Sequence, residues 1–383
     1  MEEQDILLNE NIGGWKKFCR NKLAIISLIF IVAVSLTAIL GYLITEDDSP
    51  YANRQCIEIA AKPPGFSVLF FKKPLNVEIK KVSFLNKMFF GQPSEYEYIP
   101  ISRFFFSRDS LVIFRYSNIP DENLREQYPL KSLTISSTPD LNQIKSEVSN
   151  TNIKKIKFIC GTDRFGRDMV SRLVIGARIS LSVGFIAVFI SLLIGLILGA
   201  LAGFYKGWVD SVVMWIVNVT WSVPTLLMVI SITMILGKGF WQIFIAVGLT
   251  MWVEVARIVR GQVISIREKD YIEAGRAMGF SNYRLLTKHI IPNTLGSVII
   301  ISAANFASAI LIEAGLSFLG IGVQPPVPSW GNMIKDHYGF IILNKSYLAF
   351  LPGFSIMLIV LALNYIGNGL RDAYDSKSIP LQV

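Results

Sequence analysis

Long runs without a single charged residue are the feature that most limits what this 383-residue chain can fold into. A helix needs about 20 apolar residues to cross a hydrocarbon core of about 30 Å. Six stretches reach or approach this length, and they cover residues 23–44, 179–205, 211–237, 239–253, 293–312 and 346–370. We therefore predict an all-α polytopic membrane protein with about six transmembrane helices. The third of these contains Pro224 and should be kinked there.

The composition agrees with lipid as the main solvent. Hydrophobic residues make up 52% of the chain and charged residues only 17%, whereas soluble domains carry about a quarter charged residues. The net charge of +9 raises the question of nucleic acid, but the basic residues lie in short segments beside the apolar runs, as the positive-inside rule predicts. This pattern indicates membrane lipid, and no nucleic acid, as a partner.

The charges around the first apolar run predict its orientation. Basic residues precede it and acidic residues follow it: Lys16, Lys17, Arg20, Lys22, Glu46, Asp47 and Asp48. We expect residues 1–22 to be a cytoplasmic tail and residues 23–45 the first transmembrane helix. A cleaved signal peptide is the alternative, but the run exceeds the usual ~7 to 15 residues and no small-residue cleavage site follows. Six crossings return residues 376–383 to the cytoplasm.

Residues 46–160 differ in composition and should lie outside the bilayer, because charged residues, prolines, asparagines and serines occur throughout. Four segments are rich in β-branched and aromatic residues: FSVLFF at 66–71, NVEIKKVSF at 76–84, SLVIFRY at 110–116 and NIKKIKF at 152–158. We predict an inserted extracytoplasmic β-rich domain.

The three cysteines and two histidines do not indicate a metal site. No paired Cys-x-x-Cys spacing occurs and the histidines are far apart. Cys56 and Cys160 lie near opposite edges of the expected external insert. Since an oxidising compartment permits disulfides, we state their pairing as a hypothesis.

Residues 161–375 are expected to form a core with five transmembrane helices and a cytoplasmic loop at 258–293. Part of this loop, YIEAGRAMGFSNYRLLTKHIIPN, carries four small residues within two turns, a surface that another backbone can approach closely. Ser281 is a candidate N-cap for a second short helix that ends before Pro292. Two interpretations remain open, a two-helix knob that docks into a cytoplasmic partner and an amphipathic interfacial loop.

The order of residues in this loop resembles the EAA loop of ABC importer permeases, and specifically the oligopeptide and dipeptide (peptide/nickel) branch. The residues that carry the resemblance are Glu273, Ala274, Gly275, Gly279 and Pro292. His289 stands where the general pattern has an aliphatic residue, but a histidine before the apolar pair and Pro-Asn resembles the peptide branch. The resemblance implies a coupling helix that sits in a groove of an ATPase subunit.

Two further stretches resemble the same branch, GTDRFGRDMVSRLVIGARISL from Gly161 and GLSFLGIGVQPPVPSWGNMI from Gly315. The first contains an external motif of Gly161, Thr162, Asp163, Gly166, Arg167 and Asp168. We expect a turn followed by a short amphipathic helix, Asp168 to Ala177, with Arg167, Arg172 and Arg178 toward water or headgroups. This helix would either anchor in headgroups or contact a partner protein.

Pro325, Pro326 and Trp330 predict a stiff loop at the outer interface. It would be either a rigid connector or, as the resemblance implies, part of the outer mouth of the pathway. Glu313 ends the fifth apolar run, and an acidic group at membrane depth is a functional candidate. Glu313 would either act at the outer gate of the pathway or make a structural hydrogen bond. Glu254 should pair with Arg257 on the same helix.

The chain shows no catalytic signature of its own. Gly237-Lys238-Gly239 lacks the rest of a phosphate-binding loop, and no nucleophile has a base beside it. We expect no enzyme activity and no bound cofactor, with ATP and Mg on partner ATPase subunits.

The resemblance implies one of two permease subunits, served by two ATPase subunits and an external solute-binding protein in a bacterial inner membrane. Oligopeptides or dipeptides are the expected substrates, with nickel, glutathione or a peptide antibiotic as alternatives. An ion-gradient secondary transporter and an adhesion protein are rivals from other classes.

Overall fold

The computed structural model describes residues 14–75, 82–117, 124–133, 141–237 and 239–374. It divides into two compact units, which we describe separately. The helical unit comprises Met1–Ser35, Ile179–Gln324 and Gly353–Val383. The sheet unit comprises Leu36–Arg178 and Pro325–Pro352.

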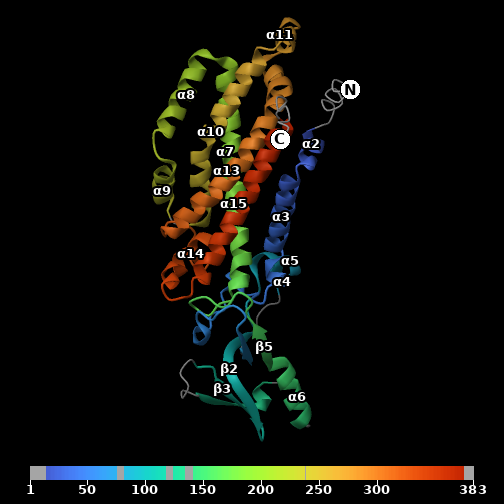
Figure 1. Ribbon diagram of the computed structural model, residues 1–383, viewed down its shortest axis with the longest axis vertical. Helices are drawn as coiled ribbons and strands as arrows, with labels where there is room; N and C mark the ends of the chain where they lie inside the picture. Colours follow the sequence, from blue (N-terminus) through green and yellow to red (C-terminus); the bar gives the residue numbers. More distant parts are fainter. Residues whose placement is uncertain (1–13, 76–81, 118–123, 134–140, 238, 375–383) are drawn as a thin grey trace, which may run out of the picture. The chain divides into compact units, whose positions relative to one another are not determined.

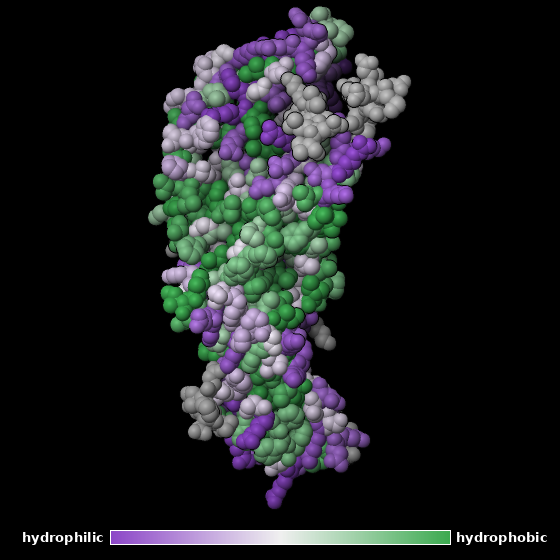
Figure 2. Space-filling view, in the orientation of Figure 1, coloured by the Kyte–Doolittle hydropathy of each residue, from purple (hydrophilic) through white to green (hydrophobic). Residues whose placement is uncertain are grey.

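Five helices in the described residues are long and apolar enough to cross a membrane, and a bent pair brings the number to six if it counts as one span. The five are α3 (Lys22–Ile39), α7 (Met169–Tyr205), α10 (Phe240–Arg267), the continuous stretch Asn282–Phe318 that contains α12 (Asn282–Arg284) and α13 (Ile291–Phe318), and α15 (Tyr347–Tyr374). This confirms the predicted all-α polytopic class. Figure 2 shows the hydrophobic side chains gathered in a broad band over the helices on the visible face.

The bent pair consists of α8 (Gly207–Trp221) and α9 (Thr225–Leu236), which meet at 93°. The predicted kink at Pro224 is therefore a full break in the helix. Pro224 is the residue before α9, with φ of −54°, and its ring removes a backbone donor and restricts the preceding residue. In the helical unit, α10 packs against α8, α9 and α13 (Figure 1).

Three glycines spaced four residues apart let α7 approach α10 closely. A Cβ added at Gly203 would lie 2.8 Å from the carbonyl oxygen of Arg260, and one added at Gly199 would collide with the carbonyl oxygen of Ala256. A Cβ added at Gly195 would lie 2.5 Å from the Cβ of Val255. Membrane helices associate through such small residues because lipid provides no hydrophobic drive between them.

The sheet unit contains a five-stranded antiparallel sheet in the order β4-β3-β2-β1-β5. Its strands are β1 (Ser67–Pro74), β2 (Tyr96–Ser107), β3 (Ser110–Arg115), β4 (Arg125–Pro129) and β5 (Ile153–Lys157). Alternate residues of β1 face opposite ways: Phe71 belongs to a core that includes Ile144 of α6 (Leu141–Asn152), and Phe70 to one that includes Cys56. The predicted β-rich region is confirmed.

Three of the four predicted strand segments coincide with β1, β3 and β5. The fourth, 76–84, lies mostly outside the described residues, and its end, Phe84, begins helix α5 (Phe84–Phe90). Strands β2 and β4 were not predicted, because β2 contains Pro100 and β4 consists largely of charged and polar residues.

Shorter elements complete the described chain. They are α2 (Gly14–Arg20), α4 (Gly41–Ile44), α11 (Asp270–Ala277), α14 (Trp330–His337), a π-helical turn (Leu285–Ile290) and four 3₁₀ turns (Pro50–Ala52, Ile57–Ile59, Leu130–Ser132 and Tyr338–Ile341).

Candidate functional site

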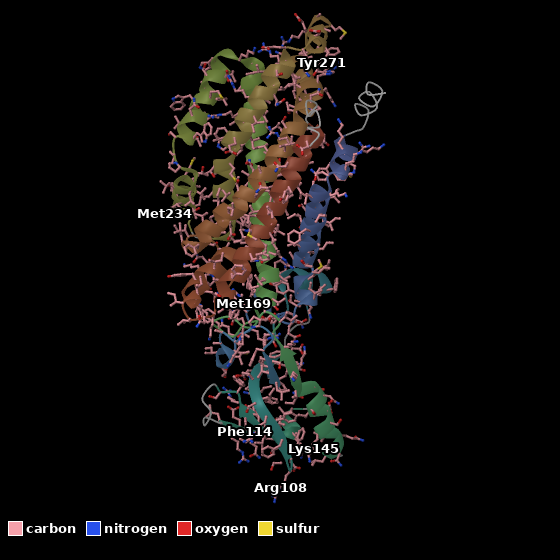
Figure 3. The ribbon with its side chains drawn as sticks, in the orientation of Figure 1. Arg108, Phe114, Lys145, Met169, Met234 and Tyr271 are labelled. Atoms are coloured by element: carbon pink, nitrogen blue, oxygen red, sulfur yellow. The ribbon has the colours of Figure 1, made fainter. Side chains whose placement is uncertain are left out.

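Residues 270–290 of the helical unit form a helical knob at one end of the bundle, where Figure 3 labels Tyr271. Helix α11 ends before Gly279, whose φ of +79° favours glycine. The Ser281 hydroxyl then accepts a hydrogen bond from the backbone N–H of Arg284 (3.3 Å). The predicted N-cap is therefore confirmed.

The second helix does not end before Pro292, which corrects the prediction. It continues without interruption from Asn282 to Phe318 over 37 residues. The π-helical turn comes directly before the proline, and the Asn293 side-chain amide donates to the carbonyl oxygen of His289 (2.6 Å). Pro292 lies inside this continuous helix and lacks a backbone N–H, and the wider π-helical turn occurs where the regular hydrogen-bond ladder is interrupted.

The small residues of the knob do not all face outward. Gly275 is buried, and a Cβ there would lie 2.9 Å from Leu285 and 3.3 Å from Phe280. Its small size therefore serves packing inside the knob. Ala274 and Gly279 are exposed, and the outer surface also presents apolar side chains, Met278 (67% exposed) and Tyr283 (77%).

His289 has a packing role that the sequence did not indicate. Its ring stacks on Phe280 with centroids 5.8 Å apart, and the guanidinium of Arg284 lies 4.1 Å from the centre of the same phenylalanine ring. These contacts join the turn after α11 to the helix that follows it.

The external motif of the sheet unit is organised around the buried carboxylate of Asp163. Its Oδ1 accepts the backbone N–H groups of Phe165 (2.8 Å) and Arg167 (2.9 Å), and its Oδ2 accepts Arg167 Nε (2.6 Å). Arg172 Nε lies 3.7 Å from the same oxygen. Arg167 and Arg172 are only 4% exposed, and Arg178 donates to the carbonyl of Ala38. The prediction that these arginines point to water or headgroups is wrong.

The external motif also packs closely against residues 56–62, the segment that precedes β1. Gly166 has φ of +72°, and a Cβ there would collide with the backbone of Cys56. Thr162 accepts the backbone N–H of Lys62 (2.9 Å) and donates to the carbonyl of Ile59. The expected turn from Gly161 to Asp168 is present, and an isolated bridge pairs Thr162 with Asp168.

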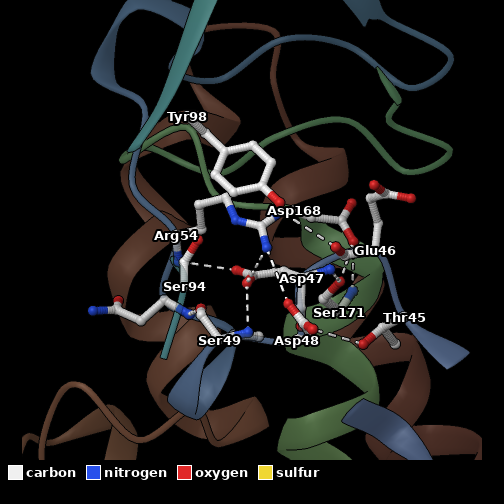
Figure 4. A network of polar contacts seen from close by, with 12 residues as sticks. Thr45, Glu46, Asp47, Asp48, Ser49, Arg54, Ser94, Tyr98, Asp168 and Ser171 are labelled. Carbon is white, nitrogen blue, oxygen red and sulfur yellow. Dashed lines mark hydrogen bonds and ion pairs between the residues drawn. The ribbon is translucent and has the colours of Figure 1, made fainter. Parts of the chain in front are cut away.

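Asp168 caps α7 and anchors a polar network (Figure 4). Its carboxylate accepts the backbone N–H of Ser171 (2.8 Å), and the Ser171 hydroxyl accepts the backbone N–H of Asp47 (3.2 Å). Arg54 donates to Asp48 (3.2 Å). Burial raises the pKa of Asp168 above its ordinary value. The amphipathic helix predicted here is simply the start of α7.

The proline-rich loop packs against the beginning of α7 within the sheet unit. Trp330 is 3% exposed and its indole N–H donates to the carbonyl of Leu173 (3.0 Å). Asp336 pairs with Arg164 (3.0 Å). Pro325 and Pro326 are joined by a cis peptide bond. Trp330 is therefore enclosed by protein and does not present its ring to lipid.

Glu313 and Glu254, the two acidic residues beside apolar runs, have different environments in the helical unit. Glu313 is fully buried and accepts hydrogen bonds from Ser317 (2.7 Å) and Ser180 (3.3 Å). Glu254 is exposed, and the predicted pair with Arg257 is absent from the described residues. Arg257 instead lies over the ring of Trp221, 3.4 Å from its centre.

The hypothesised disulfide is not present, because Cys56 and Cys160 are both free thiols. Cys56 is buried, and its Sγ donates weakly to the carbonyl of Tyr98 (3.6 Å). Cys160 is half-buried.

Thiol reactivity tests this arrangement. Burial raises the pKa of Cys56 to about 12 from an ordinary value of 9.0, and only the thiolate reacts. We expect a maleimide at pH 7.5 to label the exposed Cys19 at least tenfold faster than Cys56, which should react only after unfolding. Because the fold favours the protonated thiol, the stability contributed by Cys56 is present below pH 9 and falls as the pH rises toward 12. Rapid labelling of Cys56 in the folded protein would contradict this.

Two family models match the chain. Residues 13–64 match the N-terminal TM domain of oligopeptide transport permease C. Residues 195–379 match the binding-protein-dependent transport system inner membrane component.

Several relatives are similar to this chain over more than two thirds of their own length. The dipeptide transport system permease protein DppC of Alkalihalophilus pseudofirmus is 44% identical over 217 residues, 57% of this chain and 71% of that protein. The oligopeptide transport system permease protein OppC of Bacillus subtilis is 43% identical over the same shares. The glutathione transport system permease protein GsiD of Pectobacterium atrosepticum is 38% identical over 57% of this chain and 72% of that protein. The chain belongs to the permease family of binding-protein-dependent ABC importers.

Family membership decides the class of this protein. Permeases of this family are multi-pass membrane subunits that work with ATPase subunits and a binding protein. They carry no cofactor and hydrolyse no ATP themselves, since that chemistry belongs to the separate ATPase. An ion-gradient transporter and an adhesion protein are therefore excluded.

Proposed function

We propose that this permease forms half of the translocation pathway of an ATP-driven importer for oligopeptides or dipeptides. The observation that carries the proposal is its 43–44% identity to permeases named for dipeptide and oligopeptide transport. Glutathione is the second candidate, because a glutathione permease is 38% identical. Nickel and peptide antibiotics remain alternative substrates.

The proposed assembly contains a second permease subunit, two ATPase subunits and an extracytoplasmic binding protein in a bacterial inner membrane. We place the tails 1–22 and 376–383 in the cytoplasm and the insert 46–160 outside. In the permease core, 161–375, the loop 258–293 would then lie in the cytoplasm. The basic residues of that loop support this orientation.

We propose that the knob couples the ATPase to the pathway. The residues concerned are Glu273, Ala274, Gly275, Gly279 and Pro292. The exposed Met278 and Tyr283 provide apolar surface that a groove in the ATPase could cover. Because one unbroken helix runs from Asn282 to Phe318, a displacement of the knob would move its far end as a lever.

The external residues have a separate proposed role near the outer mouth of the pathway. The external motif (Gly161, Thr162, Asp163, Gly166, Arg167 and Asp168) would hold the sheet unit together. Pro325, Pro326 and Trp330 would form a stiff border, and Glu313 would stabilise the helical unit through its serine contacts.

Uptake by the reconstituted transporter tests the substrate. We expect ATP-dependent accumulation of radiolabelled dipeptides or tripeptides when the cognate binding protein is present, undiminished by ionophores that collapse ion gradients. Uptake of glutathione or Ni²⁺ with no peptide uptake would replace the peptide proposal with one of its alternatives.

Substitution of Gly279 tests the coupling role. Gly279→Leu should reduce peptide uptake by more than tenfold while the protein still inserts, because a leucine at φ of +79° costs about 1–2 kcal/mol in backbone strain and would distort the turn. Space is not the cause, since no atom lies within 4 Å of an added Cβ.

The matched control is Lys288→Leu, which changes an exposed knob residue that has no such backbone requirement. Its uptake should stay within about twofold of wild type. Normal coupled uptake by Gly279→Leu, normalised to inserted protein, would show that the knob is only a connector.

A further inference from the structure

The helical unit contains a cavity of about 250 Å³ beside the break between α8 and α9. Residues from the break line it, together with residues of α10 and α13: Thr220, Trp221, Val223, Thr225, Met228, Thr250, Met251, Val253, Glu254, Ser308 and Ile312. The lining is mostly apolar side chains and hydroxyls. Glu254 is the only ionisable side chain among these residues.

Glu254 lies halfway along α10, although it directly follows the apolar run 239–253. At about 1.5 Å of rise per residue, it is about 21 Å along the axis of α10 from Phe240. The hydrocarbon core is about 30 Å thick, so a helix that enters it at Phe240 still holds Glu254 at membrane depth. Ionisable groups at that depth are costly and mark binding sites or pathways by default.

The cations nearest in sequence are already engaged elsewhere. Arg257 lies over Trp221 and donates to Asn218 (3.3 Å). Arg260 donates to both carboxylate oxygens of Asp210. The carboxylate of Glu254 has no ion-pair partner among the described residues, and threonine and serine hydroxyls line the cavity beside it.

We infer that Glu254 binds an ammonium group of the transported substrate as it passes through this cavity. The inference rests on the proposed function, and it adds the substrate class, namely peptides with a free cationic nitrogen. The ammonium group donates hydrogen bonds to the carboxylate, and the two methionines, Met228 and Met251, adapt to varied side chains because the thioether is flexible and polarisable. Both the peptide amino terminus and a lysine side chain have this chemistry.

The test separates this inference from the proposed function. Uptake of Ala-Ala-Ala by the wild-type transporter with its binding protein tests the function. Equilibrium binding to the same permease–ATPase complex without binding protein then tests Glu254. The probes are Ala-Ala-Ala, N-acetyl-Ala-Ala-Ala and N-acetyl-Ala-Lys-Ala.

We expect wild type to bind Ala-Ala-Ala at least tenfold more tightly than its acetylated form, as a charge-assisted hydrogen bond implies. Glu254→Gln should abolish this preference, and Glu254→Asp should restore part of it. Recovered affinity for N-acetyl-Ala-Lys-Ala identifies the side-chain cation as sufficient, whereas no recovery assigns the site to the amino terminus.

The control is Glu97→Gln, the same substitution at an exposed residue of the sheet unit that pairs with Lys73. It should leave the preference unchanged. An undiminished preference in Glu254→Gln, no preference in wild type, or no detectable binding by a complex that transports peptide would each overturn the inference.

Discussion

Asp163→Ala should destabilise the protein by about 3–5 kcal/mol, because removing one partner of a buried ion pair leaves an uncompensated charge. Asp163 is fully buried and faces two arginines that are themselves almost completely buried. The substitution also deprives two backbone N–H groups of their acceptor. Thermal unfolding of the purified permease in detergent, followed by intrinsic fluorescence, should show a large fall in Tm or a loss of folded protein.

A surface ion pair provides the control for this prediction. Glu97 and Lys73 are 3.1 Å apart with side chains 46% and 40% exposed, and exposed pairs contribute about 0–1 kcal/mol. Glu97→Ala should therefore shift Tm only slightly. Asp163→Asn should fall between the two, since it keeps an acceptor but loses the charge. Equal shifts for Asp163→Ala and Glu97→Ala would show that the buried cluster contributes little.

Gly199→Leu should prevent α7 and α10 from packing. The added side chain would meet the backbone of Ala256, which cannot move aside as a flexible side chain can. Overpacking typically costs about 1–3 kcal/mol and sometimes more, and here the close approach itself holds the helices together. We expect little protein to elute as a monodisperse peak in size-exclusion chromatography.

Gly261→Leu is the matched control, because Gly261 lies on α10 and nothing lies within 4 Å of an added Cβ. The same substitution there should leave the elution profile intact. If both variants behaved as wild type, the approach of α7 to α10 would not depend on the glycine.

The knob shows how far local sequence information extends toward a functional site. Ser281 was recognisable as an N-cap because a cap depends on a few neighbouring residues. The contact of Gly275 with Leu285 and the stacking of His289 on Phe280 were not. They depend on how two helices fold back on each other, which residue spacing alone does not reveal.

Hydropathy by itself predicted a polytopic membrane fold and the apolar segments that form its candidate spans, because an apolar run of sufficient length has few alternatives to a membrane helix. Alternating residues likewise predicted β1, β3 and β5, since one buried face is a local pattern. The tertiary structure alone decided which charges are paired. Arg257 contacts the ring of Trp221 and does not pair with Glu254. Arg167 and Arg172 are buried beside Asp163. Whether a charge is buried depends on partners far away in the chain, because desolvation is offset only where the fold brings an opposite charge or a ring into contact.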